Sequence, residues 1–209
     1  MIPEEESASE FSWHFHDVVN ENWCYAHNMF TKEECEKIIE IGKGGKGATP
    51  LEYSHTGGGN STFEETAKVR ISPVSWLRSD IEENRWIWER MAHYIGDLNK
   101  QFFQYDLNEI QSLQFTGYDS SENGYYGKHI DMMYRSNGTR KLSVSVLLSD
   151  PETYEGGELA LYTGKNPELP PKQQGTGIFF PSWSLHEVKP VTKGMRYSLV
   201  AWTLGPKFK

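Results

Sequence analysis

The sequence predicts a mainly β fold, a sandwich or barrel of short strands supported by helices. Three observations predict it. From Ile110 onward, apolar residues recur with a period of two in short runs separated by turn residues. Before that point, two stretches have the start signals and apolar spacing of helices. The content of 37% hydrophobic and 13% aromatic residues indicates a packed domain rather than a disordered chain.

The composition limits the size of the protein and its expected partners. The 209 residues suit one domain, and residues 1–10, which contain four Glu and no basic residue, are predicted to be an acidic tail. The formal net charge of −8 disfavours nucleic acid and anionic lipid as partners. The longest uncharged apolar stretch, near Leu142–Ser149, is far shorter than the ~20 residues that cross a bilayer. With no targeting signal and two cysteines, we expect a cytoplasmic protein without a disulfide framework.

The N-terminal half, residues 11–108, is predicted to provide the supporting helices. Residues 11–30 are rich in aromatic side chains and are expected to pack as strand and loop. A capping box follows, in which Thr31 caps the start of a helix and Glu34 pairs with it. Because glycine ends helices, we expect this helix to stop at Gly42.

Glycines dominate the next segment, since seven of them lie between Gly42 and Gly59. Such backbone freedom suits a mobile surface loop or a lid, and a tolerated insertion is an equally good interpretation. Ala67–Ser72 then has the composition of a strand, which Pro73 is expected to end.

A second helix is predicted after a capping box at Ser79–Glu82. Its apolar residues follow at steps of three, four and seven, which place them in one stripe on a helix. The stripe consists of Ile81, Trp88, Met91, Ile95, Leu98 and Phe102. We expect this stripe to pack against the sheet as part of the core.

Seven strand-like runs form the rest of the chain. They are Gln111–Tyr118, Tyr125–Asp131, Lys141–Ser149, Glu158–Tyr162, Gly177–Pro181, Leu185–Val188 and Met195–Leu204. The turns between them include Asn137-Gly138, Asp150-Pro151, Gly156-Gly157 and Pro170-Pro171. Residues 110–204 are therefore the expected β core of a single domain that covers residues 11–209.

Two of these strands have faces of different character, because alternate side chains of a strand point to opposite sides of a sheet. One face of each strand is apolar: Leu142, Val144, Val146 and Leu148 in the first, and Tyr197, Leu199 and Ala201 in the second. The opposite faces are mixed: Ser143, Ser145 and Leu147 in the first, and Arg196, Ser198, Val200 and Trp202 in the second. We expect the apolar faces to pack on helices and the mixed faces to line a polar cavity; the alternative is that the mixed faces meet water.

His129, Asp131 and His186 are the candidate metal ligands. The first two are separated by one residue in a predicted strand, so both side chains point to one face of the sheet. Two histidines and one carboxylate occupy one face of an octahedron and leave three positions open, as in non-haem Fe(II) oxygenases. A His-x-Asp tripeptide is a weak signal in a chain with seven histidines, and the distant His186 and a cation on a cavity-facing strand strengthen it. The weaker histidine candidates are His14, His16, His27, His55 and His93.

Several strings around these residues carry a family resemblance. They are Gln114–Tyr118 (QFTGY), Tyr126–Asp131 (YGKHID), Leu148–Leu159 (LSDPETYEGGEL), Phe180–Ser182 (FPS) and His186–Ser198 (HEVKPVTKGMRYS). With them the chain resembles the Fe(II)/2-oxoglutarate-dependent dioxygenases, and within these the prolyl 4-hydroxylase-like and PKHD-type hydroxylases. The resemblance is close over residues 110–204 and looser over the helical half, where it includes Arg70–Ser72.

The resemblance implies a fold and a reaction. The implied fold is a double-stranded β-helix, a jelly-roll or cupin-like barrel with helices packed on one sheet. The implied reaction is hydroxylation of a C–H bond with Fe(II), 2-oxoglutarate and O2, giving succinate and CO2, with ascorbate as a candidate reductant. His129, Asp131 and His186 would ligate the iron as the catalytic residues.

The resemblance also implies a binding site for 2-oxoglutarate. Arg196 would pair with the 5-carboxylate, which a guanidinium binds through two hydrogen bonds. Ser198 would add a hydroxyl, Tyr118 would hydrogen-bond the cosubstrate and Trp202 would form a wall near the iron. The chain departs from some relatives in having Arg196 in place of Lys, and Leu147 in place of a tyrosine, with Ser198 as a candidate substitute for that tyrosine.

The substrate is the least determined part of this hypothesis. A prolyl residue in a peptide or protein is the leading expectation, and it rests on the resemblance. The alternatives are the same chemistry on another amino acid or a small molecule, a catalytically silent binding module, and a zinc-dependent cupin-like hydrolase or isomerase. The oligomeric state is left open.

Overall fold

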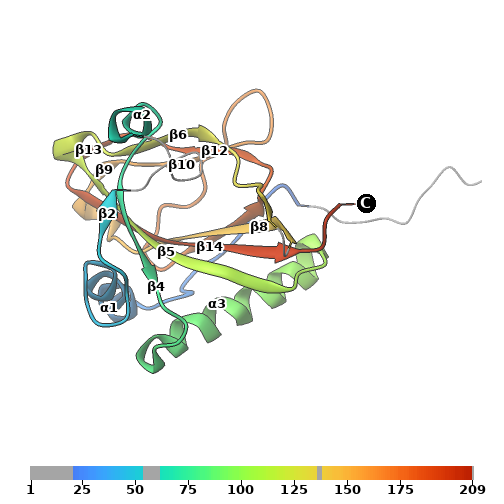
Figure 1. Cartoon of the computed structure of the whole chain (residues 1–209). Coiled ribbons are helices and arrows are strands. Elements are labelled where there is room, and N and C mark those ends of the chain that lie inside the picture. Colours follow the sequence, from blue (N-terminus) through green and yellow to red (C-terminus); the bar gives the residue numbers. More distant parts are fainter. Residues whose placement is uncertain (1–20, 54–61, 136–137, 209) are drawn as a thin grey trace, which may run out of the picture.

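A large antiparallel sheet, covered by helices on one side and by a smaller sheet on the other, forms the computed structural model (Figure 1). It describes residues 21–53, 62–135 and 138–208. The helices are α1 (Lys32–Gly42), α2 (Phe63–Ala67) and α3 (Arg85–Leu98), with short helical turns η1 (Glu82–Asn84), η2 (Asn99–Phe103), η3 (Ser120–Glu122) and η4 (Pro151–Thr153). The predicted acidic tail, His14, His16 and His55 lie outside the described residues.

The strands divide into two principal sheets. They are β1 (Cys24–Ala26), β2 (Glu52–Tyr53), β3 (Arg70–Ile71), β4 (Pro73–Leu77), β5 (Glu109–Asp119), β6 (Tyr125–His129), β7 (Tyr134–Arg135), β8 (Gly138–Leu147), β9 (Glu155–Gly156), β10 (Leu159–Tyr162), β11 (Gly177–Pro181), β12 (Leu185–Val188), β13 (Val191–Lys193) and β14 (Met195–Gly205). The large sheet has the order β1-β11-β8-β14-β5-β4-β2, with β7 beside β8; the small sheet has the order β10-β12-β6-β3, and β13 pairs with β9. The predicted mainly β fold with helices on one sheet is confirmed.

The apolar faces of β8 and β14 form the floor of the core, as their alternation predicts. Leu142, Val144, Val146 and Leu199 have no exposed surface and belong to one cluster with residues of α1 and α3. Figure 1 shows α1 and α3 on the side of the large sheet that faces away from the small sheet. Burial of these faces at about 25 cal/mol per Å² is the main stabilising term that holds the helices to the sheet.

Helix α1 begins and ends where the sequence predicts. Thr31 is its N-cap, and the reciprocal hydrogen bonds with Glu34 complete the capping box. Gly42, the last residue of the helix, lies directly against the ring of Phe115 in β5: a Cβ placed on Gly42 would lie 2.2 Å from Cγ of Phe115. Phe115 is fully buried in the core, so its ring has no open space to move into.

Gly42→Ala is therefore expected to lower the free energy of unfolding by about 3 kcal/mol, since an added methyl in a packed core forces strain. Gly96→Ala is the matched control, because Gly96 is an exposed residue of α3 with nothing within 4 Å of an added Cβ. The free energy of unfolding of this control is expected to rise by about 1 kcal/mol, because alanine has a higher helix propensity than glycine. Urea denaturation of both variants measures the difference, and equal stabilities would contradict the close packing at Gly42.

The start of α3 differs from the prediction. Ser79 is not an N-cap, and the helix begins at Arg85 after the turn η1, with no side-chain cap. The reason is tertiary: the amide of Asn84 is buried and donates to the carbonyls of Gly47 and Arg78. These contacts hold the chain in a different path through residues 79–84, and the predicted apolar stripe of α3 joins the core from Trp88 onward.

The predicted strand Ala67–Ser72 is also wrong in its bounds. Ala67 ends the short helix α2, β3 covers Arg70 and Ile71 alone, and Pro73 starts β4 instead of ending a strand. The chain changes sheets at this point, because β3 pairs with β6 in the small sheet and β4 pairs with β5 in the large sheet. Proline is compatible with the first position of a strand, so Pro73 is no obstacle to β4.

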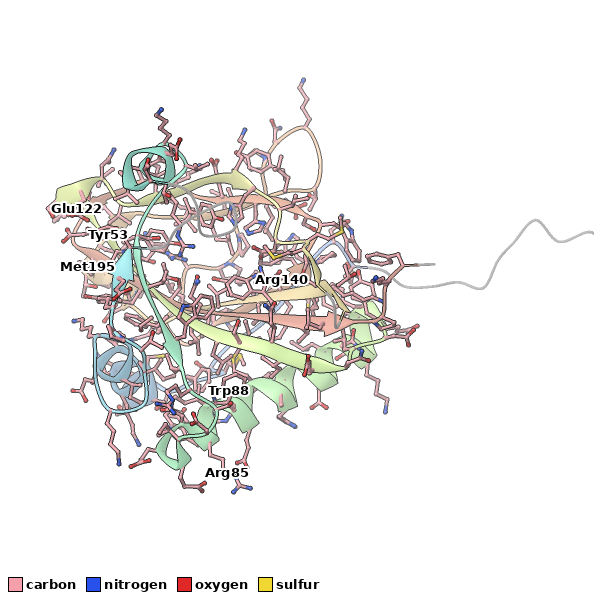
Figure 2. The ribbon with its side chains drawn as sticks, in the orientation of Figure 1. Tyr53, Arg85, Trp88, Glu122, Arg140 and Met195 are labelled. Atoms are coloured by element: carbon pink, nitrogen blue, oxygen red, sulfur yellow. The ribbon has the colours of Figure 1, made fainter. Side chains whose placement is uncertain are left out.

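The described part of the glycine-rich segment is tied to the sheet. The Arg78 amide donates to the Gly47 carbonyl, and Ala48 forms a bridge with Leu77. Farther along, the Tyr53 hydroxyl donates to Glu122 in η3, and Figure 2 shows the two side chains together. Residues 54–59 lie outside the described part, so the lid stays a prediction.

Among the described residues, no helix is long and apolar enough to cross a membrane.

Candidate metal centre

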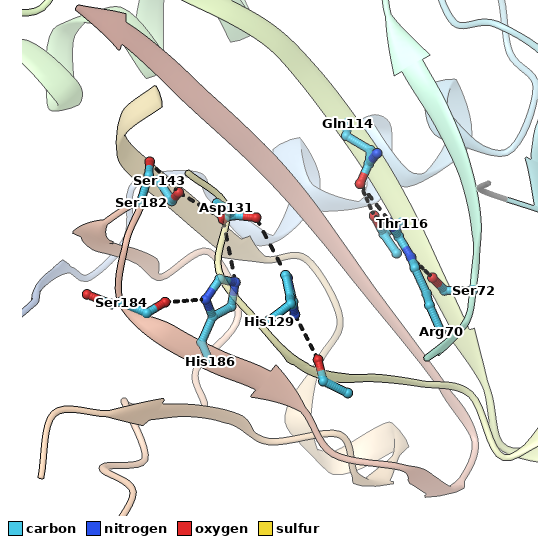
Figure 3. Close-up of polar contacts among 11 residues, drawn as sticks. Arg70, Ser72, Gln114, Thr116, His129, Asp131, Ser143, Ser182, Ser184 and His186 are labelled. Atoms are coloured by element: carbon cyan, nitrogen blue, oxygen red, sulfur yellow. Dashed lines mark hydrogen bonds and ion pairs between the residues drawn. The ribbon is translucent and has the colours of Figure 1, made fainter. Parts of the chain in front are cut away.

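The fold brings His129, Asp131 and His186 together, as predicted, with candidate ligand atoms that all lie within 4.8 Å of one another. His129 and His186 are directly opposite each other on the paired strands β6 and β12 of the small sheet. Asp131 lies two residues beyond the end of β6, so the predicted strand is shorter than expected. Its amide and that of Met132 donate to the Ser182 carbonyl. Figure 3 shows the Asp131 carboxylate directed toward the two imidazoles.

Both imidazoles are oriented by backbone carbonyls. Nδ1 of His129 is 2.8 Å from the Gly127 oxygen, and Nδ1 of His186 is 2.9 Å from the Ser184 oxygen (Figure 3). A carbonyl oxygen only accepts, so each Nδ1 carries the hydrogen and each Nε2 of a neutral ring keeps its lone pair. The Nε2 atoms lie 3.7 Å and 3.5 Å from the two oxygens of Asp131. This arrangement directs two nitrogen lone pairs and one carboxylate to a single point.

The electrostatics of the site favour ligand protonation states. Burial lowers the pKa of His129 to about 4, with a further contribution from the neighbouring His186, so the imidazole of His129 is neutral at pH 7. Burial raises the pKa of Asp131, but the two histidines and the hydrogen bond from Ser143 outweigh this effect, and the net shift is downward. The site therefore presents an ionised carboxylate beside a neutral imidazole, as metal ligands must be.

Ser143 supports the carboxylate from the large sheet. Its hydroxyl donates to Oδ2 of Asp131 at 2.8 Å and lies 2.9 Å from the Ser182 hydroxyl, and both serines are fully buried. Ser143 is on the mixed face of β8, so the alternation of that strand predicted its direction toward the site. This hydrogen bond from a neutral hydroxyl fixes the position of one carboxylate oxygen of Asp131.

Ser143→Ala is expected to weaken metal binding about 10-fold, the usual effect of removing a hydrogen bond that orients a ligand. Isothermal titration with Mn²⁺ measures the affinity. Ser145→Ala is the matched control. Ser145 lies two residues after Ser143 on the same face of β8, and among the described residues its hydroxyl forms no hydrogen bond with Asp131. Equal losses in the two variants would show that Ser143 has no specific effect on Asp131.

A cavity beside the triad lies between the two sheets. The three candidate ligands line it together with Tyr118, Ser198 and Trp202. The mixed faces of β8 and β14 therefore line a cavity, as predicted, and do not meet water: Ser145, Ser198 and Trp202 line it and are at most 8% exposed.

Arg196 is a buried cation that lines an adjoining cavity. It lies on β14 with its guanidinium carbon 5.1 Å from the Tyr118 ring centre, and Nη1 donates to the Ser198 hydroxyl at 3.2 Å. No carboxylate of the described residues forms an ion pair with Arg196. A buried charge without a partner is costly, so this site favours an anionic ligand.

Sequence reasoning assigned no role to two groups that also line the cavity. The Tyr126 ring stacks on the His129 imidazole at 3.5 Å between centres, and the guanidinium carbon of Arg70 lies 4.6 Å from the centre of the Tyr126 ring. Arg70 donates to Ser72 and to Gln114 on β5 (Figure 3). Residues two apart in a strand share a face, so Gln114 and Tyr118 lie on one face of β5. This alternation could have predicted from the sequence that both side chains line the cavity.

The donor set fits a ferrous ion. Two imidazole nitrogens and one carboxylate are the facial ligands of non-haem Fe(II) sites, whereas structural zinc sites need four protein ligands. Here the three ligand groups border a cavity, where the remaining coordination positions of an ion are accessible to small molecules. The described residues contain no other group of three or more His, Cys, Asp or Glu side chains that could hold a metal.

Comparison with known proteins agrees with this geometry. Residues 113–204 match the family described as the 2OG-Fe(II) oxygenase superfamily. One PKHD-type hydroxylase of Prochlorococcus marinus is 45% identical over 83 residues, 40% of this chain and 38% of that protein. A second, from Prochlorococcus marinus (strain MIT 9312), is 30% identical over 151 residues, 68% of this chain and 66% of that protein. The match thus spans between 38% and 66% of these relatives.

A solved structure extends the likeness to most of the chain. It is a prolyl hydroxylase from Trichoplax adhaerens in complex with a hypoxia inducible factor peptide fragment, with a TM-score of 0.67 and 18% identity. The match covers 88% of this chain and 84% of the other. At this identity the likeness concerns the fold, and it confirms the predicted double-stranded β-helix with helices on one sheet.

Proposed function

We propose that this chain, which belongs to the 2OG-Fe(II) oxygenase superfamily, is a hydroxylase that uses Fe(II), 2-oxoglutarate and O2. The single observation that carries the proposal is the joint arrangement of two sites. A three-residue donor set lines one cavity between the sheets, and the buried cation Arg196, which has no ion-pair partner among the described residues, lines a second cavity that meets the first at Ser145 and Leu159. A small molecule with an oxo-acid group at one end and a carboxylate at the other matches both.

His129, Asp131 and His186 are the proposed ligands of the iron. When bound, the ferrous ion supplies the one-electron chemistry with O2 that hydroxylation of a C–H bond requires. The protein contributes ligand direction, because backbone carbonyls hold both imidazoles and Ser143 holds the carboxylate. Preorganised ligands need no rearrangement when the ion enters, which strengthens binding.

Arg196 is the proposed partner of the 5-carboxylate of 2-oxoglutarate. Its guanidinium is buried, and a carboxylate that binds it exchanges water for a charge-assisted, bidentate contact. Tyr118 supports the guanidinium from its ring face, and Ser198 fixes Nη1. Pairing at this end would leave the opposite end of the cosubstrate free to reach the triad, because the cavity of Arg196 adjoins the cavity of the triad at Ser145 and Leu159.

Burial of the site is the third contribution of the protein. Trp202 is 6% exposed and Phe180 is 2% exposed, and both line the cavity. Apolar walls exclude water, which strengthens every polar contact inside and limits unproductive reaction with solvent. We propose that residues 11–209 act as one domain, whose helices hold the large sheet and whose two sheets hold the site.

The proposed substrate is a prolyl residue in a peptide or protein. Its support is the likeness in fold to a prolyl hydroxylase whose solved complex contains a peptide fragment. The same chemistry on another amino acid or a small molecule is the alternative. Decarboxylation of 2-oxoglutarate to succinate and CO2 would accompany either reaction.

Succinate formation with Fe(II) and 2-oxoglutarate tests the proposed function. We expect turnover that rises when a peptide substrate is added, with a gain of one oxygen atom in the peptide mass. Peptides with proline replaced by alanine serve as the matched control. Succinate without peptide oxidation would support the alternative substrates, and turnover with zinc that is indifferent to 2-oxoglutarate would overturn the proposal.

A further inference from the structure

A second cavity adjoins the first one at Ser145 and Leu159, which line both. Arg196 lines this second cavity together with Tyr154. Each of these two side chains is 3% exposed. Among the described residues, neither the Tyr154 hydroxyl nor Nε of Arg196 has a hydrogen-bond partner of good geometry, although the Arg196 guanidinium lies close enough to the hydroxyl to lower its pKa. Two buried polar groups in one cavity thus lack partners, although buried groups are normally satisfied.

The fold holds Tyr154 firmly in this place. The residue links the turn η4 to the short strand β9, and Gly194 approaches it so closely that an added Cβ would lie 3.1 Å from its Cα. Its ring belongs to the same buried cluster as Tyr118 and Leu147. The ammonium of Lys172 lies 4.1 Å from the ring centre. The hydroxyl is therefore directed by a packed ring rather than by a mobile side chain.

Gly157 brings Tyr154 and Arg196 side by side. An added Cβ on Gly157 would lie 2.8 Å from Cδ of Arg196 and 3.5 Å from Cε2 of Tyr154. Both side chains therefore pack against the same bare backbone. The φ of Gly157 is +64°, a conformation that favours glycine.

The two unpartnered groups share one chemistry. A guanidinium has donors only, and a phenol that keeps its proton donates one hydrogen bond. Burial raises the pKa of Tyr154, against the opposite effect of Arg196, so the hydroxyl is protonated at pH 7. Two donors beside a buried positive charge match a carboxylate, which accepts through both of its oxygens.

We propose that Tyr154 donates its hydroxyl hydrogen to the terminal carboxylate that Arg196 pairs with, and thereby selects 2-oxo acids that end in a carboxylate. This inference rests on the proposed function. Leu147 stands where some relatives carry a tyrosine, and Tyr154 reaches the same cluster from a different element, the segment between η4 and β9. Tyr154 is a binding residue in this role and takes no part in the reaction at the metal.

Tyr154→Phe tests the proposal, because it removes the hydroxyl and keeps the ring. Calorimetric titration of the Mn²⁺-loaded full chain gives the affinity for two ligands: 2-oxoglutarate, and 2-oxopentanoate, which has the same length and ends in a methyl group. We expect Tyr154→Phe to weaken 2-oxoglutarate about 10-fold, since a hydrogen bond to a charged group is lost. The affinity for 2-oxopentanoate is expected to stay at the wild-type value.

Tyr197→Phe is the matched control, because Tyr197 neighbours Arg196 in β14 and its ring stacks on Phe115 on the opposite face of the sheet. It is expected to bind both ligands like the wild type. Equal weakening of both ligands by Tyr154→Phe would assign Tyr154 a structural role, and unchanged 2-oxoglutarate binding would remove it from the site; either result overturns the inference while the proposed function stands. A wild-type chain that binds no 2-oxoglutarate would overturn the proposed function as well.

Discussion

His129→Ala is expected to abolish metal binding and, with it, all turnover above the level of the metal-free protein. Removal of one of three ligands leaves an imidazole and a carboxylate, which hold a divalent ion far more weakly. The variant also removes the ring on which Tyr126 stacks, but this site lies between the sheets and apart from the main core, so the fold is expected to persist.

Thermal unfolding with added Mn²⁺ measures this effect independently of activity. A ligand that binds the folded state alone raises stability in proportion to the logarithm of its concentration over Kd. We expect the midpoint of the wild type to rise with Mn²⁺ and that of His129→Ala to stay constant. His93→Ala is the control, since His93 is an exposed residue of α3 that pairs with Asp97. A wild-type response in His129→Ala would remove His129 from the metal centre.

Arg196→Ala is expected to weaken 2-oxoglutarate binding about 100-fold or more, because truncation of a buried charge partner costs several kcal/mol. The metal affinity is expected to change little, since the guanidinium is not one of the candidate ligands. Arg196→Lys keeps the positive charge but loses the planar guanidinium that binds a carboxylate through two hydrogen bonds, so an intermediate affinity for 2-oxoglutarate is expected. Anaerobic titration of the metal-loaded chain with 2-oxoglutarate measures all three affinities.

The stability of the same variant gives a second readout. Arg196 carries a buried charge without an ion-pair partner among the described residues, and its removal relieves that cost. Arg196→Ala without ligand is therefore expected to unfold at the wild-type urea concentration or above it. Arg85→Ala, at the exposed start of α3 (Figure 2), is the control for a general loss of charge. Normal 2-oxoglutarate binding by Arg196→Ala would exclude this arginine from the cosubstrate site.

The local sequence was sufficient to predict strands β8 and β14 and the faces that they present. Alternation in β8 and β14 separates residues packed on the helices from residues that line the cavity, and burial confirms the division. A strand has only two faces, so a period of two determines direction without knowledge of the fold. The same reasoning holds for α1, whose capping box is a contact within four residues.

Long-range packing decided the features that the sequence left open. Ser79 is not the start of α3, because the side-chain amide of Asn84 donates hydrogen bonds to the carbonyls of Gly47 and Arg78 and holds residues 79–84 in another path. The chain changes sheets near Ser72 because β3 and β4 have partners far along the sequence. Tyr154 and Arg196 are 42 positions apart, and only the close approach at Gly157 places them in one cavity.

The chain by itself thus determined the class of the fold, the three candidate ligands and the cation that accompanies them. These features follow from residue chemistry and from the period of each segment, which are local properties. The tertiary structure decided how Asp131 reaches the imidazoles beyond its strand, which hydroxyl supports it and which tyrosine neighbours Arg196. Such contacts join residues that are distant in the chain, and their geometry exists only once both sheets have packed.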